Sequence, residues 1–177
     1  MQLDKEALIQ AFRDMEDFAV LKKLDCPPLY LLGGSASIIT GCLDRATRDI
    51  DLLDLDYSAT AGRLFRILGD VDYLDIRLTT LAEGYERRAI RVKEIQNLPI
   101  YALSVEDIIV TKIGRYSAKD REDIAHLYKT SNPKVIAQLI ENVKARQDMS
   151  EKVKAHFIEN VEEFRRDFNV QHVATKS

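Results

Sequence analysis

Leu29-Tyr30-Leu31-Leu32-Gly33-Gly34-Ser35 and, after thirteen further residues, Asp49-Ile50-Asp51 form the most informative segment of this 177-residue chain. The apolar run before the glycines predicts a short buried strand. Two adjacent glycines allow a sharp turn and a close approach of the backbone to a ligand. Ser35 then opens a predicted helix, whose free N–H groups favour phosphate oxygens. A Gly-Gly turn alone is more often a simple turn, so the phosphate interpretation depends on the residues that follow.

Two carboxylates stand at the start of the next predicted strand. Side chains two residues apart in a strand point to the same face, so Asp49 and Asp51 would lie side by side while Ile50 points into the core. Mg²⁺ prefers carboxylates together with substrate phosphates, and a cation would relieve the repulsion between the two side chains. The same pattern also fits a solvated sheet face, or a pair of carboxylates that Arg45 or Arg48 neutralises.

Strands and helices alternate along most of the chain. Apolar runs and helical periodicity predict strands over 29–32, 50–55, 71–78 and 98–103, a basic β-like segment over 86–95, and helices over 4–23, 35–43, 59–69 and 152–168. Ser104 and Asn132 are predicted N-caps of two further helices. This alternation predicts an α/β fold with a helical C-terminal part. We expect one domain, with a core over residues 1–130 and a helical extension over residues 131–177.

Composition narrows the class of protein. Hydrophobic residues make up 46% and charged residues 31% of the chain, which is ordinary for a globular protein. The net charge of −3 argues against a general nucleic-acid coat. No apolar run reaches the length of a membrane span, and the N-terminal residues lack a signal-peptide pattern. Cys26 and Cys42 have no metal-ligand spacing, so we expect free thiols in a reducing compartment. We therefore expect a cytoplasmic protein with no membrane partner.

Charged side chains gather at two other places in the sequence. Lys112, Arg115 and Lys119 would share a helix face, unless Tyr116-Ser117-Ala118 breaks the helix. Local salt bridges to the aspartates that follow account for these residues equally well. The basic segment over 86–95 puts three cationic side chains on one predicted strand face: Arg87, Arg91 and Lys93. That face would contact RNA or a triphosphate, or would only protect an edge strand.

The glycine–serine turn followed by the Asp-x-Asp strand resembles the signature of the DNA polymerase beta-type nucleotidyltransferase superfamily. The resemblance implies the nucleotidyltransferase fold, a small mixed β-sheet flanked by helices. It also implies that Gly33, Gly34 and Ser35 hold a nucleoside triphosphate and that Asp49 and Asp51 hold two Mg²⁺ ions, with Mn²⁺ as an alternative. A neighbouring strand supplies a third carboxylate in this superfamily. Asp72 and Asp75 are the candidates; they face opposite sides of their strand, and we favour Asp75 as a catalytic residue.

A narrower resemblance covers the segment after the last strand. Ser104-Val105-Glu106-Asp107-Ile108-Ile109, Lys112 and the run from Lys119 to Ile124 look like a bacterial and archaeal nucleotidyltransferase-like family. That family is related to the abortive-infection toxins of toxin–antitoxin systems. The resemblance implies that Lys112 contacts nucleotide phosphate and that Asp120 or Asp123 holds a cationic side chain in place. It also implies a toxin-like role and a cognate antitoxin as partner.

The expected function is transfer of a nucleoside monophosphate from a nucleoside triphosphate to an acceptor hydroxyl on RNA, protein or a small molecule. The alternative is a binding or regulatory protein that keeps the nucleotidyltransferase fold with weak or no turnover. The apolar stripe of Phe157, Val161 and Phe164 predicts either core packing or the seam of a homodimer formed through the C-terminal helices.

Overall fold

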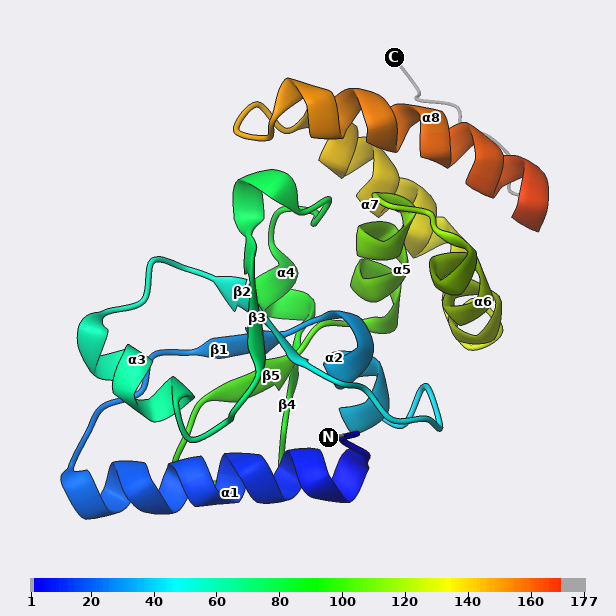
Figure 1. The fold of residues 1–177 in the computed structure, drawn as a ribbon. Coiled ribbons are helices and arrows are strands. Elements are labelled where there is room, and N and C mark those ends of the chain that lie inside the picture. Colours follow the sequence, from blue (N-terminus) through cyan, green and yellow to red (C-terminus); the bar gives the residue numbers. More distant parts are fainter. Residues whose placement is uncertain (1, 170–177) are drawn as a thin grey trace. The chain divides into compact units, whose positions relative to one another are not determined.

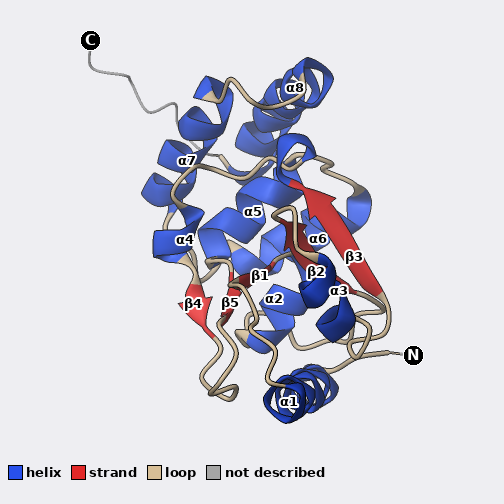
Figure 2. Ribbon diagram, turned by 90° about the vertical axis from the view of Figure 1, so that its left-hand side faces the viewer, coloured by secondary structure: helices blue, strands red, loops and turns tan. Residues whose placement is uncertain are grey.

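A mixed five-stranded sheet forms the framework of the computed structural model, which describes residues 2–169 (Figures 1 and 2). Its strands are β1 (Leu29–Leu31), β2 (Ile50–Asp54), β3 (Val71–Asp75), β4 (Ile90–Arg91) and β5 (Ile100–Ala102), in the order β3-β2-β1-β5-β4 across the sheet. The pairs β2–β3 and β1–β5 are parallel, and the pairs β1–β2 and β4–β5 are antiparallel. The prediction of an α/β fold with a small mixed sheet and flanking helices is confirmed.

The described residues form two compact units. The sheet unit comprises residues 2–75 and 88–103 and contains all five strands, and the helical unit comprises residues 76–87 and 104–169. Neither unit has a boundary at residue 130, and the predicted division at that residue stays a prediction. Residues 170–177 of the predicted helical extension lie outside the described residues.

Helices α1 (Lys5–Lys22), α2 (Gly33–Ile39) and α3 (Ala59–Phe65) belong to the sheet unit, and α1 runs beneath α2 and α3 (Figures 1 and 2). Asp4 caps α1 by accepting a hydrogen bond from the N–H of Ala7 at 2.9 Å. The helix ends at Lys22, and the C-cap residue Lys23 has a left-handed φ of 51°. One face of α1 is buried, as the helical spacing predicts: Leu8, Ile9, Phe12, Met15 and Ala19.

Several elements are shorter than predicted. The helix predicted over 35–43 begins at Gly33 and ends at Ile39, so both glycines belong to its first turn. The strand predicted over 71–78 ends at Asp75, and Ile76–Leu78 form a 3-10 turn, η1. The helix predicted over 59–69 ends at Phe65. These differences lie at the ends of elements, where local sequence signals are weakest.

The basic segment over 86–95 is not a continuous strand, contrary to the prediction. Gly84 has a left-handed φ of 71°, and the chain then forms the short helix α4 (Tyr85–Arg88) before it reaches β4. Arg87 and Arg91 therefore do not share a strand face. The guanidinium of Arg91 instead donates to three backbone carbonyl groups, those of Gln96, Leu98 and Ile100. These hydrogen bonds stabilise the connection between β4 and β5.

The longer helices of the helical unit are α5 (Val105–Ile113), α6 (Ala118–Leu127), α7 (Pro133–Ala145) and α8 (Glu151–Phe168). Ser104, Ser117 and Asn132 cap the first three of these, since each side chain accepts a hydrogen bond from a backbone N–H in the first turn. The N-caps predicted at Ser104 and Asn132 are confirmed.

A break separates α5 from α6. Tyr116 has a left-handed φ of 48°, and Ser117 forms a capping box with Asp120 at the start of α6. Lys112 and Lys119 therefore lie on different helices, and the shared face predicted for a continuous helix is not formed.

The apolar stripe of α8 lies in the core of the helical unit, where Phe157, Val161 and Phe164 are fully buried. Phe164 packs edge-on against Tyr116 and Tyr128, with ring centroids 6.4 Å and 6.1 Å apart. The stripe therefore contributes to core packing, and a homodimer through the C-terminal helices stays a prediction.

Candidate nucleotide site

The double glycine brings the backbone against a carboxylate of the neighbouring strand. Gly33 has a left-handed φ of 58°, and a Cβ built on it would collide with Asp51 Oδ2. Only glycine fits this position, because any side chain would meet the carboxylate in a strained backbone conformation. The N–H of Gly34 donates to Asp51 Oδ2 at 3.0 Å. Asp51 therefore occupies one of the N–H groups that the sequence assigns to phosphate.

Ser35 joins the turn to β2. Its side chain is fully buried, and its hydroxyl donates to the carbonyl oxygen of Leu32 at 3.0 Å. The same hydroxyl oxygen accepts a hydrogen bond from the N–H of Asp51 at 3.2 Å. Ser35 thus fixes the turn and the strand relative to each other, and its predicted contact with a phosphate stays a prediction.

The register of β2 and β3 decides which carboxylate lies beside Asp51. These strands are parallel, and Asp51 is opposite Asp72, whereas Asp54 is opposite Asp75. Partners in register point to the same face, and residues three apart on a strand point to opposite faces. Asp72 therefore shares the face of Asp51, and Asp75 lies on the other face. The assignment of Asp75 as the third carboxylate stays a prediction. The strand register favours Asp72 instead, because Asp72 lies on the same face as Asp51.

Asp49 differs from Asp51 in its surroundings. It precedes the first residue of β2 and its side chain is exposed, whereas Asp51 lies within the strand and is half-buried. The oxygen donors of Asp49, Asp51 and Asp72 fit the preference of Mg²⁺ for hard ligands. Among residues 2–169, no group of three or more histidine, cysteine, aspartate or glutamate side chains already converges on a point that would hold a metal ion.

A cationic side chain also reaches the turn. A Cβ built on Gly34 would lie 3.1 Å from Thr47 Oγ1 and 3.8 Å from Arg45 Nη2. Arg45 and Thr47 belong to the connection between α2 and β2. The sequence indicates Arg45 only as a neutralising charge for the aspartates, because no local signal shows that this connection folds back onto the glycines.

Lys112 lies in the helical unit, in a cluster of buried charges. Its ammonium group contacts Asp123 Oδ2 at 2.7 Å and Asp120 Oδ1 at 3.4 Å, and Arg115 binds Asp120 with two hydrogen bonds of 3.0 Å and 3.2 Å. Burial favours the neutral form of Asp120, but hydrogen bonds from Arg115 and Ser117 and the charge of Lys112 prevail and lower the pKa of its carboxyl. Both aspartates hold Lys112, and its contact with nucleotide stays a prediction.

The comparison with protein families bears on both units. A family model described as "Nucleotidyltransferase of unknown function (DUF6036)" matches residues 6–169. The chain belongs to this nucleotidyltransferase family. The matched range contains the double glycine, the aspartates of β2 and β3, and the Lys112 cluster. No curated protein and no solved structure matches the chain. Membership in a nucleotidyltransferase family implies a nucleotide substrate, whereas the link to toxin–antitoxin systems stays a prediction.

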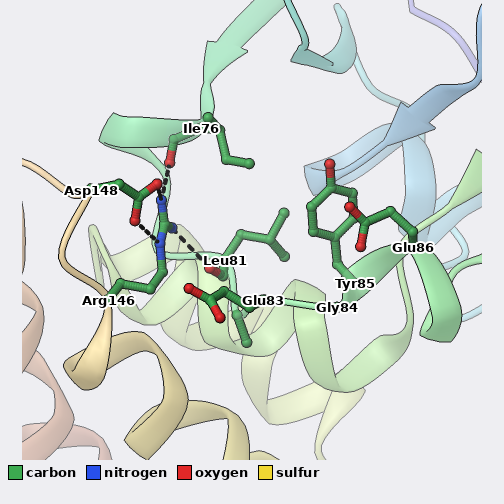
Figure 3. A pocket seen from close by; sticks show the side chains of 9 residues that line it. Ile76, Leu81, Glu83, Gly84, Tyr85, Glu86, Arg146 and Asp148 are labelled. Atoms are coloured by element: carbon green, nitrogen blue, oxygen red, sulfur yellow. Dashed lines mark hydrogen bonds and ion pairs between the residues drawn. The ribbon is translucent and has the colours of Figure 1, made fainter.

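This family member also has a cavity of about 210 Å³ within its helical unit (Figure 3). Its lining combines apolar side chains with charged ones: Ile76, Leu81, Ala82, Tyr85, Glu83, Glu86, Arg146 and Asp148, together with Gly84. Arg146 is only 3% exposed and donates to the carbonyl oxygens of Ile76, Thr79 and Leu81 and to both carboxylate oxygens of Asp148. All five of its N–H donors are thus used within the protein.

No helix within residues 2–169 combines the length and the apolar character needed to cross a membrane. Cys26 and Cys42 are free, half-buried thiols, and burial raises the pKa of the Cys26 thiol to about 11. The Cys26 thiol is therefore protonated at neutral pH.

Proposed function

We propose that this family member is a metal-dependent enzyme that transfers a nucleoside monophosphate from a nucleoside triphosphate to an acceptor hydroxyl. The observation that carries the proposal is the juxtaposition of the double-glycine turn with Asp51, whose register partner Asp72 lies on the same sheet face. Carboxylates from two adjacent strands beside a turn that admits no side chain suit a metal-bound triphosphate. The match to a nucleotidyltransferase family supports the same substrate class.

Each residue of the turn and of the neighbouring strand has a defined role in this proposal. Asp49 and Asp51 would hold two Mg²⁺ or Mn²⁺ ions together with a third carboxylate, and Gly34 would offer its N–H to a phosphate oxygen. When bound, the ions supply charge neutralisation for the triphosphate and lower the pKa of the attacking hydroxyl. Gly34 donates to Asp51 in the structure, so its N–H would be available to a phosphate oxygen only if Asp51 bound the ions instead. Ser35 keeps the turn and β2 in register throughout.

The acceptor oxygen forms a bond to the α-phosphorus while the bond from that phosphorus to the bridging oxygen breaks. Pyrophosphate leaves, and the hydroxyl proton passes to solvent. The protein contributes positioning and stabilisation of charge.

Calorimetry tests the binding part of this proposal. A non-hydrolysable nucleoside triphosphate is titrated, with Mg²⁺, into the wild-type protein and into the D49N/D51N variant. We expect the variant to lose at least about tenfold in affinity, because the carboxylates that would hold the ions become neutral. The control is Asp54→Asn, on the same strand but on the opposite face from Asp51. Equal binding by D49N/D51N and the wild type would exclude the proposed site.

Transfer itself is tested with α-labelled nucleoside triphosphates and candidate acceptors of three classes: RNA, protein and small hydroxyl compounds. Label that moves to an acceptor in the wild type, and not in D51N, supports the enzyme and identifies the acceptor class. The proposal also includes a toxin-like role in the cytoplasm with a cognate antitoxin. A toxin-like role predicts that expression of the wild type arrests growth and that expression of D51N does not.

One observation favours a second candidate, a binding protein without turnover. The hydroxyl of Ser35 is fully buried and already bonded to backbone groups of Leu32 and Asp51, so a group predicted to contact phosphate also stabilises the fold. Tight, Mg²⁺-dependent triphosphate binding without transfer to any of the three acceptor classes would support this candidate over the enzyme.

A further inference from the structure

The space above the double glycine is bounded by three polar side chains. Asp51 lies against Gly33, and Thr47 and Arg45 lie against Gly34, with Arg45 Nη2 3.8 Å from the position of a Cβ on that glycine. The three side chains come from β2 and from the connection before it. A ligand that reaches the turn would therefore meet a carboxylate on one side and a hydroxyl and a guanidinium on the other.

The connection that carries Arg45 is tied down close to this arginine. Leu3 and Thr47 form an isolated β-bridge, in which the N–H of Leu3 donates to Thr47 O at 2.7 Å and the N–H of Thr47 donates to Leu3 O at 2.9 Å. Leu3 is itself buried, at 6% exposure. Arg45 is partly buried, whereas Arg48 in the same connection is exposed. The bridge fixes the backbone two residues from Arg45, and a segment that is already held in place loses less conformational entropy when it binds a ligand.

The turn needs such a cation to bind an anion well. Helix α2 has seven residues, and the N–H of Gly34 already meets a carboxylate, so the end of the helix alone offers little to a phosphate. A guanidinium binds phosphate oxygens through two parallel N–H donors and stays charged at any physiological pH. Arg45 supplies this group beside Gly34, where its Nη2 lies 3.8 Å from the position of a Cβ on that glycine.

We propose that Arg45 binds the phosphates of the nucleoside triphosphate at the double-glycine turn, with the Thr47 hydroxyl as a second donor. This inference rests on the proposed function and names the residue that makes the site selective for a polyphosphate over a nucleoside. The alternative role of Arg45 is structural, as a neutralising charge for the nearby carboxylates.

Calorimetry with three probes separates these roles: a non-hydrolysable nucleoside triphosphate, inorganic triphosphate and the free nucleoside, each with Mg²⁺. We expect Arg45→Gln to weaken the binding of both triphosphates by about 10-fold to 100-fold and to leave nucleoside binding unchanged. Arg45→Lys keeps the charge but loses the bidentate geometry, so its triphosphate affinity should lie between those of the wild type and R45Q. Arg48→Gln is the matched control, with the same loss of charge three residues away and an expected change below about twofold. Thr47→Val, which keeps the backbone bridge to Leu3, weakens the triphosphates by about 5-fold.

Unchanged triphosphate affinity in both R45Q and T47V would overturn this inference and leave the proposed function standing. A structural role for Arg45 has its own signature: Mn²⁺ binds the R45Q variant more tightly, thermal stability falls, and triphosphate affinity does not. No triphosphate binding by the wild type would overturn both the inference and the proposed function. Circular dichroism on each variant separates loss of binding from loss of folding, and R45K provides the charged variant if R45Q does not fold.

Discussion

Asp51 Oδ2 accepts a hydrogen bond from the N–H of Gly34 at 3.0 Å, so one carboxylate joins the double-glycine turn to the second strand of the sheet. The contact leaves no room for a Cβ on Gly33. The same three residues therefore determine both the local fold and the chemistry proposed for it. Changes at the turn are expected to affect stability as well as binding, and the two effects have to be measured separately.

Gly33→Ala should destabilise the protein by about 3 kcal/mol, because the new Cβ meets Asp51 Oδ2 and the left-handed backbone is itself unfavourable for alanine. Urea denaturation at neutral pH measures this change. Gly69→Ala is the matched control, since Gly69 has a φ of 81° but open space around it, and the expected loss is only about 1 kcal/mol. Equal losses at the two positions would mean that the contact with Asp51 is unimportant for stability.

The β2–β3 register makes a prediction about the third carboxylate. Asp72→Asn should weaken Mn²⁺ binding by about tenfold, because Asp72 lies beside Asp51 on the same face, and Asp75→Asn should leave Mn²⁺ binding nearly unchanged. Electron paramagnetic resonance of free Mn²⁺ gives both affinities. A larger effect at Asp75 would restore the assignment made from sequence and would show that the site lies on the other face of the sheet.

Stability should depend on pH through Asp120. The pKa of this carboxyl is lowered in the folded state from an ordinary value of 3.8, so its ionised form stabilises the fold above that value. The stabilisation is lost as the pH falls through the lower folded pKa. The difference in unfolding free energy between the wild type and Asp120→Asn should therefore be largest near neutral pH and shrink below about pH 4. A difference that stays constant down to about pH 2 would contradict the ion pairs described for this residue.

Arg146→Met should cost about 3 kcal/mol of unfolding free energy, because three carbonyl groups lose their donor and Asp148 loses its counter-charge. Methionine approximates the volume of the arginine stem, so the loss would come mainly from the hydrogen bonds. Arg63→Met, at an exposed position of α3, is the control and should change stability by less than about 0.5 kcal/mol. Urea denaturation of both variants measures the difference, and similar values would mean that the carbonyl groups find other partners.

Features set by neighbouring residues could be predicted from the sequence. The buried face of α1 follows from helical spacing, and the N-caps at Ser104 and Asn132 follow from side chains that bond to the next turn. The strand before the double glycine follows from its apolar run. In each case the deciding contacts span a few residues.

Features set by distant contacts could not be predicted. The choice between Asp72 and Asp75 depends on how β3 pairs with β2, and a shift of one residue would reverse it. The position of Arg45 beside the glycine turn depends on the path of the connection between α2 and β2. Arg146 finds its carbonyl partners more than sixty residues earlier in the chain, at Ile76, Thr79 and Leu81. The strand predicted over 86–95 is wrong because the charges of that segment carry no signal for the turn at Gly84.

The bridge between Leu3 and Thr47 fixes the connection that carries Arg45, the arginine proposed to bind phosphate. Replacing Leu3 with proline, which removes the N–H that donates to Thr47 O, would release the connection that carries Arg45 while leaving every side chain of the proposed site unchanged. Such a variant should bind triphosphate more weakly through a faster dissociation rate. Binding strength in this protein would then be adjustable at Leu3, a residue whose side chain lies outside the proposed site.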